Sequence, residues 1–251
     1  MLKKIFIIFI LSLLFACNGE NVDNCFQNSG DIITKDFEHG AFDKITVFER
    51  IELILIDGDE YKIQLETGEY LENDIDAKIE DGRLMLTNDN ACNITREYGI
   101  TKFYVTAPNI TEIRNSSGLT VRSQNVLNYP NLTLISEDFE EEDIYHTDGP
   151  FDLNINSQSL TIVINNLSHL LLRGKVTLLN VNFYSGDARL DGRNLVAQNI
   201  KIYHRGTNDM ILNPQQSITG KIVSAGDVIL LTAPPIIEVE EVYTGRLILP
   251  D

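Results

Sequence analysis

Three aspartates in the second half of the chain have a spacing that could align carboxylates along one surface. Asp187, Asp209 and Asp227 lie about 20 residues apart, each in or just after a glycine turn. If strands stack at about 4.8 Å, Asp187 and Asp227 would be about 9.6 Å apart. An inverting glycosidase holds its two carboxyl groups roughly 6.5–9.5 Å apart. With Asp191 and His204 nearby, this acid ladder suits an envelope enzyme that cuts acidic polysaccharides.

A structural role explains the same aspartates with fewer assumptions. An aspartate beside a glycine commonly accepts hydrogen bonds from backbone amides in a turn. The chain also contains no tryptophan, whereas sugar clefts usually present large aromatic platforms. We therefore expect a protein that is not an enzyme, and we keep the polysaccharide-active enzyme as the alternative.

No metal or cofactor is expected. The acidic run from Glu137 to Asp143 could gather calcium through oxygen ligands, but it lacks the spaced pattern of a calcium loop, so we expect a solvated bulge. The four histidines have no zinc-ligand spacing. The sequence has neither a glycine-rich phosphate loop nor a nucleophile elbow.

The first seventeen residues predict export and lipid anchoring. Lys3 and Lys4 precede an apolar run too short to span a bilayer, and the run ends in Leu14-Phe15-Ala16-Cys17, which is a lipobox. We expect removal of residues 1–16 as a lipoprotein signal peptide and acylation of Cys17, with membrane lipid as its partner. The alternative is a plain secreted protein.

Residues near the cleavage site and the overall charge define the expected location. Asn18 follows the cysteine where an aspartate would commonly retain a lipoprotein at the inner membrane, so we expect an outer-membrane lipoprotein on the periplasmic or surface face. The formal charge is −17, and loss of the two lysines with the signal makes it −19. Such an acidic chain repels phosphate backbones, so nucleic acid is not an expected partner.

Two cysteines remain after Cys17. An exported compartment permits disulfides, and the even remainder favours a bridge between Cys25 and Cys92. Two buried free thiols are the alternative. The bridge would fasten the segment after the lipid anchor to the body of the fold.

Short strands and regular turns predict the architecture. Runs such as Lys102-Phe103-Tyr104-Val105-Thr106 alternate apolar and polar residues, and turn residues separate them. Gly186, Gly206, Gly226 and Gly245 lie 20, 20 and 19 residues apart, and Asn166 falls one step earlier. This period favours an all-β, right-handed β-helix-like solenoid with rungs of about 20 residues and these glycines at its corners. An antiparallel sandwich is the alternative.

We expect residues 17–30 to form a lipid anchor and tether. Residues 31–251 would form a single solenoid domain. A corner glycine would let the chain turn with a positive φ, and stacked corners would keep neighbouring rungs in register.

A set of short motifs is spread along most of the chain. They are Phe42-Asp43-Lys44-Ile45-Thr46-Val47, Ile51-Glu52-Leu53, Asp81-Gly82-Arg83-Leu84, Val105-Thr106-Ala107-Pro108-Asn109-Ile110, Ile113-Arg114-Asn115-Ser116-Ser117-Gly118, Gly186-Asp187, Gly226-Asp227 and Pro234. Through these motifs the sequence, from about Phe42 to Pro234, resembles the putative auto-transporter adhesin, head GIN domain family of bacterial envelope proteins. The resemblance implies a right-handed β-helix of short rungs and no catalytic residues.

Taken together, these patterns predict a lipid-anchored envelope protein that binds an envelope polymer or a protein partner through an extended β surface. Adhesion is the expected class of function. The rivals are the polysaccharide-active enzyme and an accessory or sensor subunit of the envelope.

Overall fold

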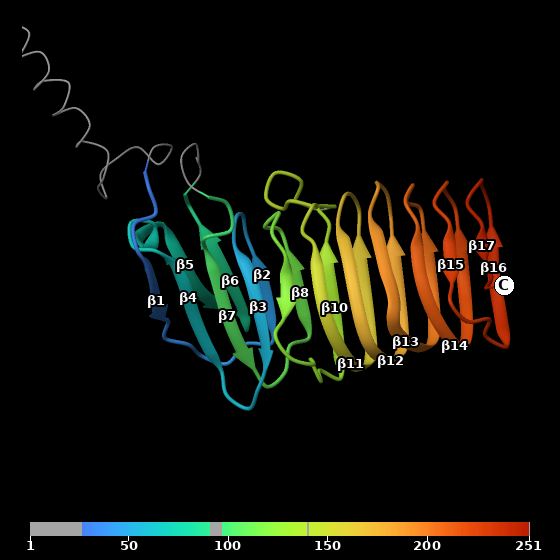
Figure 1. Ribbon diagram of the computed structural model, residues 1–251, viewed down its shortest axis with the longest axis horizontal. Coiled ribbons are helices and arrows are strands. Elements are labelled where there is room, and N and C mark those ends of the chain that lie inside the picture. Colours follow the sequence, from blue (N-terminus) through green and yellow to red (C-terminus); the bar gives the residue numbers. More distant parts are fainter. Residues whose placement is uncertain (1–26, 91–96, 140, 251) are drawn as a thin grey trace, which may run out of the picture.

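The computed structural model describes residues 27–90, 97–139 and 141–250, and nearly all of its regular structure is strand (Figure 1). In these ranges the only helix is a single 3₁₀ turn, η1 (Glu72–Asp74), and no helix is long and apolar enough to cross a membrane. The all-β prediction is confirmed.

Alternating side chains explain why these segments form strands with one buried face. In β7 (Lys102–Ala107), Phe103, Val105 and Ala107 are buried, whereas the residues between them are partly exposed. This period of two places every second side chain on the same face of a strand. Each strand can therefore bury an apolar row and keep a polar row at the surface.

The strands form two walls that run the length of the molecule. The first wall stacks β7, β3, β9, the first parts of β11 to β14, β15 and β17 in that order. Besides β7, this wall contains β3 (Glu52–Asp57), β9 (Val121–Ser123), β11 (Phe151–Ile164), β12 (His169–Phe183), β13 (Arg189–His204), β14 (Met210–Ile222), β15 (Val228–Leu230) and β17 (Leu247–Ile248).

The second wall lies beside the first and is also parallel. It stacks β6, β2, β8, β10, the second parts of β11 to β14, and β16. Its own strands are β6 (Arg83–Asn88), β2 (Lys44–Val47), β8 (Glu112–Asn115), β10 (Asn131–Ser136) and β16 (Ile236–Glu241). We use the word rung for three consecutive parts of the chain: a second-wall strand, the corner that follows it, and the next first-wall strand. In Figure 1 the corners from β10 onward form a row along one edge of the stack.

Successive rungs in the C-terminal half are in register. Leu160 pairs with Leu179, Leu179 with Ile200, Ile200 with Ile218, and Ile218 with Ile237. These pairing offsets of 18 to 21 residues lie close to the period of the glycines. Parallel pairing in register stacks like residues above one another, so the apolar rows become continuous.

The N-terminal rungs are not stacked in chain order. Strand β2 lies between β6 and β8, with Lys44 opposite both Arg83 and Glu112, and β3 lies between β7 and β9. The offsets there are 39 and 68 residues rather than about 20. In the chain, a segment that carries β4 (Lys62–Gly68), η1 and β5 (Ile75–Glu80) separates β3 from β6.

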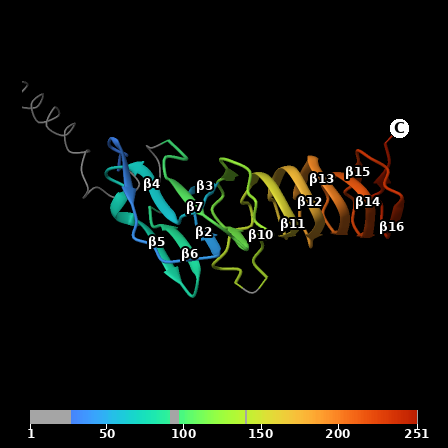
Figure 2. The same ribbon diagram turned by 90° about the horizontal axis from the view of Figure 1, so that it is seen from below.

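Antiparallel strands cover the end of the stack formed by β6 and β7. Strand β4 pairs with β7, β5 pairs with β6, and β1 (Ile32–Asp36) pairs with β4, all antiparallel. Figure 2 shows these strands as a broad end beside the narrower column from β11 to β16. Such a cover removes the open edge that β6 and β7 would otherwise present.

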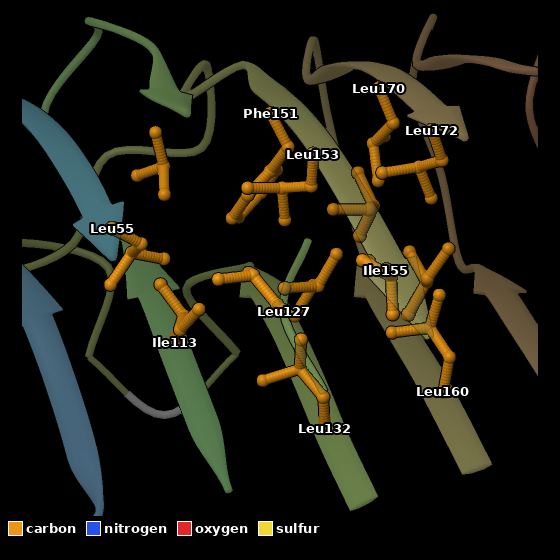
Figure 3. Close-up of a cluster of buried hydrophobic side chains, with 14 of the residues drawn as sticks. Leu55, Ile113, Leu127, Leu132, Phe151, Leu153, Ile155, Leu160, Leu170 and Leu172 are labelled. Atoms are coloured by element: carbon orange, nitrogen blue, oxygen red, sulfur yellow. The ribbon is translucent and has the colours of Figure 1, made fainter. Parts of the chain in front are cut away.

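A single apolar core fills the space between the walls. Leu153 and Ile155 come from the first part of β11 and Leu160 from its second part, and all three are fully buried. Figure 3 shows them with Leu55 and Ile113 from earlier strands. Each fully buried side chain of this kind contributes roughly 1.5–3 kcal/mol to the free energy of unfolding.

Candidate functional site

The four predicted glycines lie at the corners between the second and first walls, but two of them are required for a different reason than expected. Gly186 has a positive φ of 84°, whereas φ is not positive at Gly206, Gly226 and Gly245. A Cβ at Gly226 would lie 2.2 Å from the Asn208 carbonyl oxygen, and one at Gly245 would lie 2.3 Å from the Gly226 carbonyl oxygen. Close contact between stacked corners therefore explains these two glycines.

The acid ladder runs along the same corners and bonds one rung to the next. Asp187 Oδ1 accepts a hydrogen bond from Thr207 Oγ1 at 2.8 Å. Asp209 Oδ1 accepts the Asp227 backbone N–H at 3.0 Å, and Asp227 Oδ1 accepts the Arg246 backbone N–H at 2.7 Å. These carboxylates satisfy backbone and hydroxyl donors of the next rung, so their geometry gives the enzyme hypothesis no support.

The two groups expected near the ladder are also engaged elsewhere. Burial raises the pKa of Asp191, but hydrogen bonds from Arg193, including Nε at 2.8 Å, outweigh it and leave the pKa below its usual value. His204 is fully buried and packs edge-on against Phe183, with ring centroids 5.9 Å apart. Burial lowers the pKa of His204 more than the Asn208 backbone and the nearby carboxylates raise it, so the site favours the neutral imidazole.

The acidic run forms part of the enlarged corner between β10 and β11. Glu137 faces Arg114 of β8, which donates from Nη2 to Glu137 Oε1 at 2.7 Å and from Nη1 to its carbonyl oxygen at 2.6 Å. Asp138 Oδ1 accepts Asn165 Nδ2 at 2.6 Å. Among the described residues, no three His, Cys, Asp or Glu side chains gather as metal ligands. The start of the run is thus tied to the stack, whereas Phe139 and Glu141 to Asp143 are exposed, as expected for a solvated bulge.

This corner overhangs an open hollow of about 600 Å³, which we call the loop hollow. It lies between the enlarged corner and the outer side of the second wall. The described residues that line it are Arg114, Glu137, Asp138, Phe139, Glu141, Tyr145, Val163 and Tyr184.

Aromatic rings stand on both sides of the loop hollow. On one side the Arg114 guanidinium lies 4.2 Å from the centre of the Tyr145 ring, which stacks on Phe48 at 6.0 Å. On the other side Phe139 meets Tyr184 edge-on at 5.3 Å, and Tyr184 packs against Tyr203 of the next rung at 5.5 Å. We call Phe48, Tyr145, Phe139, Tyr184 and Tyr203 the aromatic band.

The lining of the loop hollow is acidic. Its described residues include three carboxylates and one base, Arg114, which is already paired with Glu137. Within the described ranges, the Glu141 carboxylate has no ion-pair or hydrogen-bond partner, and the same holds for the phenol groups of Tyr145 and Tyr184. The hollow can therefore offer π faces, a free carboxylate and hydroxyl groups to a ligand.

Sequence reasoning identified the acidic run but not the hollow. Tyr184 and Tyr203 do stand in the aligned segments before Gly186 and Gly206, so their position on the outer face could have been inferred. The contribution of Arg114 to the hollow could not have been inferred, because it depends on how β8 pairs with β10. The predicted sites at Cys17, Cys25 and Cys92 lie outside the described residues.

Comparison with known proteins gives one family and several similar folds. The sequence profile of a family described as "Putative auto-transporter adhesin, head GIN domain" matches residues 41–234. A search among curated proteins finds no match.

Solved structures share the architecture at low sequence identity. A putative adhesin from Bacteroides fragilis has a TM-score of 0.75 and 17% identity, and the match covers 89% of this chain and 99% of that one. A putative lipid binding protein from Parabacteroides distasonis has a TM-score of 0.61 and 12% identity, covering 88% and 98%. A putative adhesin from Parabacteroides merdae has a TM-score of 0.59 and 15% identity, covering 88% and 97%. At such identities the likeness concerns the fold alone.

Proposed function

The chain belongs to the putative auto-transporter adhesin, head GIN domain family, and on that premise we propose that it is a lipid-anchored cell-envelope protein that binds an extended partner through its stacked strands. The observation that carries this proposal is the in-register stacking of rungs from β10 to β16, which repeats outward side chains along the molecule. Stacked repeats of this kind suit extended binding surfaces.

We infer that the rungs form a right-handed β-helix within a single domain, residues 31–251. Parallel β connections in one sheet are almost always right-handed, which supports that hand. The segment before the domain would be the tether, and Cys17 would carry the lipid at the outer membrane. Several acyl chains anchor a protein firmly, because each buried methylene contributes about 0.8 kcal/mol.

The outer faces of the walls carry ordered rows that a long partner could follow. On the first wall Arg122 bridges Glu52 and Asp152, and Asp152 Oδ1 also binds Arg173 Nη2 at 2.7 Å. On the second wall the aromatic band runs across several rungs. Because these rows cross rungs, a partner lying along the stack would contact many of them at once.

The anchor and the binding are tested separately in the bacterium that produces the chain. We expect the wild type to partition with membranes and to be cleaved by protease added to intact cells, and Cys17→Ser to be released to the soluble fraction. Membrane retention of Cys17→Ser would contradict the anchor.

For the binding, cells lacking the chain should adhere less to an immobilised protein matrix than cells with the gene restored. Equal adhesion would contradict the adhesion proposal. Cells that express the chain with Asp187, Asp209 and Asp227 all changed to Asn serve as a control and should adhere normally.

A further inference from the structure

The loop hollow already contains one example of the ligand chemistry that it suits. The Arg114 guanidinium lies 4.2 Å from the centre of the Tyr145 ring and is bonded to Glu137. The two side chains of this ion pair are only 16% and 13% exposed. An aromatic face combined with a carboxylate holds a cation well, particularly where water is largely excluded.

In the part of the chain that the structure describes, the opposite side of the hollow offers the same groups without a cation of its own. Phe139 is 54% exposed and Tyr184 is 37% exposed, although both are large aromatic residues. Glu141 stands on the same lining and, among the described residues, has no cationic partner. A second guanidinium or ammonium group would thus find a ring and a carboxylate.

Charge selects among the ligands that an aromatic surface could bind. The lining residues that the structure describes carry three acids against one base, and the whole chain has a formal charge of −17. Anionic polymers are repelled by such a field, and neutral sugars gain nothing from it, whereas basic groups are attracted.

The shape of the site favours a chain rather than a small amine. The hollow is open and has a volume of about 600 Å³, and Tyr184 on its lining packs against Tyr203 of the next rung. An extended peptide could place one basic side chain in the hollow and lay its neighbours along the aromatic band.

We propose that the loop hollow binds an arginine or lysine side chain of a basic segment in a partner protein. This inference rests on the proposed adhesive function and names the chemistry of its partner. The new cation lies on Tyr184 and Phe139 and pairs with Glu141, across the hollow from Arg114.

Calorimetry with the full chain in detergent tests the proposal, using four probes: hexa-arginine, hexalysine, hexaglutamate and maltohexaose. The two basic peptides should bind with an affinity that falls as salt is raised, and the other two should not bind. Binding of maltohexaose in place of the basic peptides would overturn the proposal in favour of a glycan site. Absence of binding by all four would overturn it as well.

Matched variants separate the site from the general charge of the protein. Glu141→Gln should weaken hexa-arginine binding roughly three- to tenfold, as expected for loss of an ionic partner beside an aromatic face. Glu142→Gln removes the same charge from the adjacent residue, which is exposed and lies outside the lining, and should have little effect on hexa-arginine binding. Equal weakening by both variants would show unspecific attraction and overturn the site.

Ring variants test the aromatic part. Tyr184→Ala should weaken hexa-arginine binding by a similar factor, and Tyr184→Phe should restore most of it because the π face remains. Tyr243→Ala removes a ring that is 65% exposed at another corner and should bind like the wild type. Thermal melts of each variant report whether the fold is kept, and full binding by a folded Tyr184→Ala protein would overturn the proposal.

The outcome is independent of the adhesion experiment. If deletion of the gene reduces adhesion but Glu141→Gln and Tyr184→Ala neither weaken peptide binding nor reduce adhesion, the proposed function stands and the site is wrong. If the variants lose peptide binding while deletion leaves adhesion unchanged, the site stands and the adhesive function is wrong.

Discussion

The carboxylate of Asp209 accepts a hydrogen bond from the backbone N–H of Asp227 on the next rung, with 3.0 Å between Oδ1 and N. Asp227 repeats the relationship with Arg246 one rung further on, at 2.7 Å. Residues whose spacing resembled that of a catalytic pair thus act as links between corners. Each link satisfies a backbone donor that the turn leaves outside the parallel ladder, so the aspartates stabilise the stack where its strands end.

Removing one link should lower stability without abolishing folding. Asp209→Ala leaves the Asp227 N–H without its acceptor and should reduce the free energy of unfolding by about 1 kcal/mol. Asp209→Asn keeps an acceptor oxygen and should lose less. Urea denaturation measures both, with the exposed Asp143→Ala as a control. A loss for Asp143→Ala as large as that for Asp209→Ala would contradict a specific link.

Close stacking of the corners predicts that Gly226 cannot carry a side chain. An alanine Cβ there would lie 2.2 Å from the Asn208 carbonyl oxygen and 2.6 Å from His204 Nε2, so backbone or imidazole must shift. Gly226→Ala should therefore cost about 1–3 kcal/mol of unfolding free energy. Gly40→Ala is the matched control, because nothing lies within 4 Å of its added Cβ and its φ is not positive. Equal melting temperatures for the two variants would refute the steric explanation.

The repeat could be predicted from the sequence because it depends on local residues. Alternating burial in segments such as β7 and the spacing of Gly186, Gly206 and Gly226 both follow directly from the order of residues. The reason for each glycine could not be predicted, because a positive φ and a close contact select the same residue type. Only the structure shows that Gly186 combines a φ of 84° with a close contact to Asn166, whereas Gly226 has a close contact without a positive φ.

Long-range pairing explains what the sequence could not predict. The position of β2 between β6 and β8 depends on pairs of residues that are separated by 39 and by 68 positions in the sequence. No local pattern specifies such separations. The loop hollow has the same origin, because Arg114, Tyr145 and Tyr184 come from three separate segments. A single sequence shows that each is present, but not that they meet.

The buried imidazole of His204 predicts a loss of stability in mild acid. Its folded pKa is lowered, chiefly by burial, so the unfolded chain binds a proton more readily than the folded chain. The contribution of the neutral His204 imidazole to the free energy of unfolding is fully present above the ordinary histidine pKa of about 6.5. It is lost as the pH falls below that value. Urea midpoints at pH 8 and pH 5 should therefore differ more for the wild type than for His204→Gln. His39, His146 and His169 are exposed and are common to both proteins. An identical pH dependence of the two proteins would contradict this role of His204.

The ion pair between Arg114 and Glu137 should stabilise the enlarged corner far more than an exposed pair would. Their side chains are 16% and 13% exposed, and the guanidinium makes two hydrogen bonds with Glu137 while it covers the Tyr145 ring. Removal of one partner leaves the other charge largely buried and unpaired, so Arg114→Ala should cost about 3 kcal/mol of unfolding free energy.

A double-mutant cycle isolates the contribution of that pair. The coupling energy between Arg114→Ala and Glu137→Ala should be at least about 1 kcal/mol and should change little with salt, because the pair is shielded from solvent. The pair of Lys221 and Glu240 provides the control, since its side chains are 54% and 60% exposed, and it should show no measurable coupling at physiological salt. Coupling at Arg114 that disappears in high salt would mean that water reaches the pair, and would contradict its shielding from solvent.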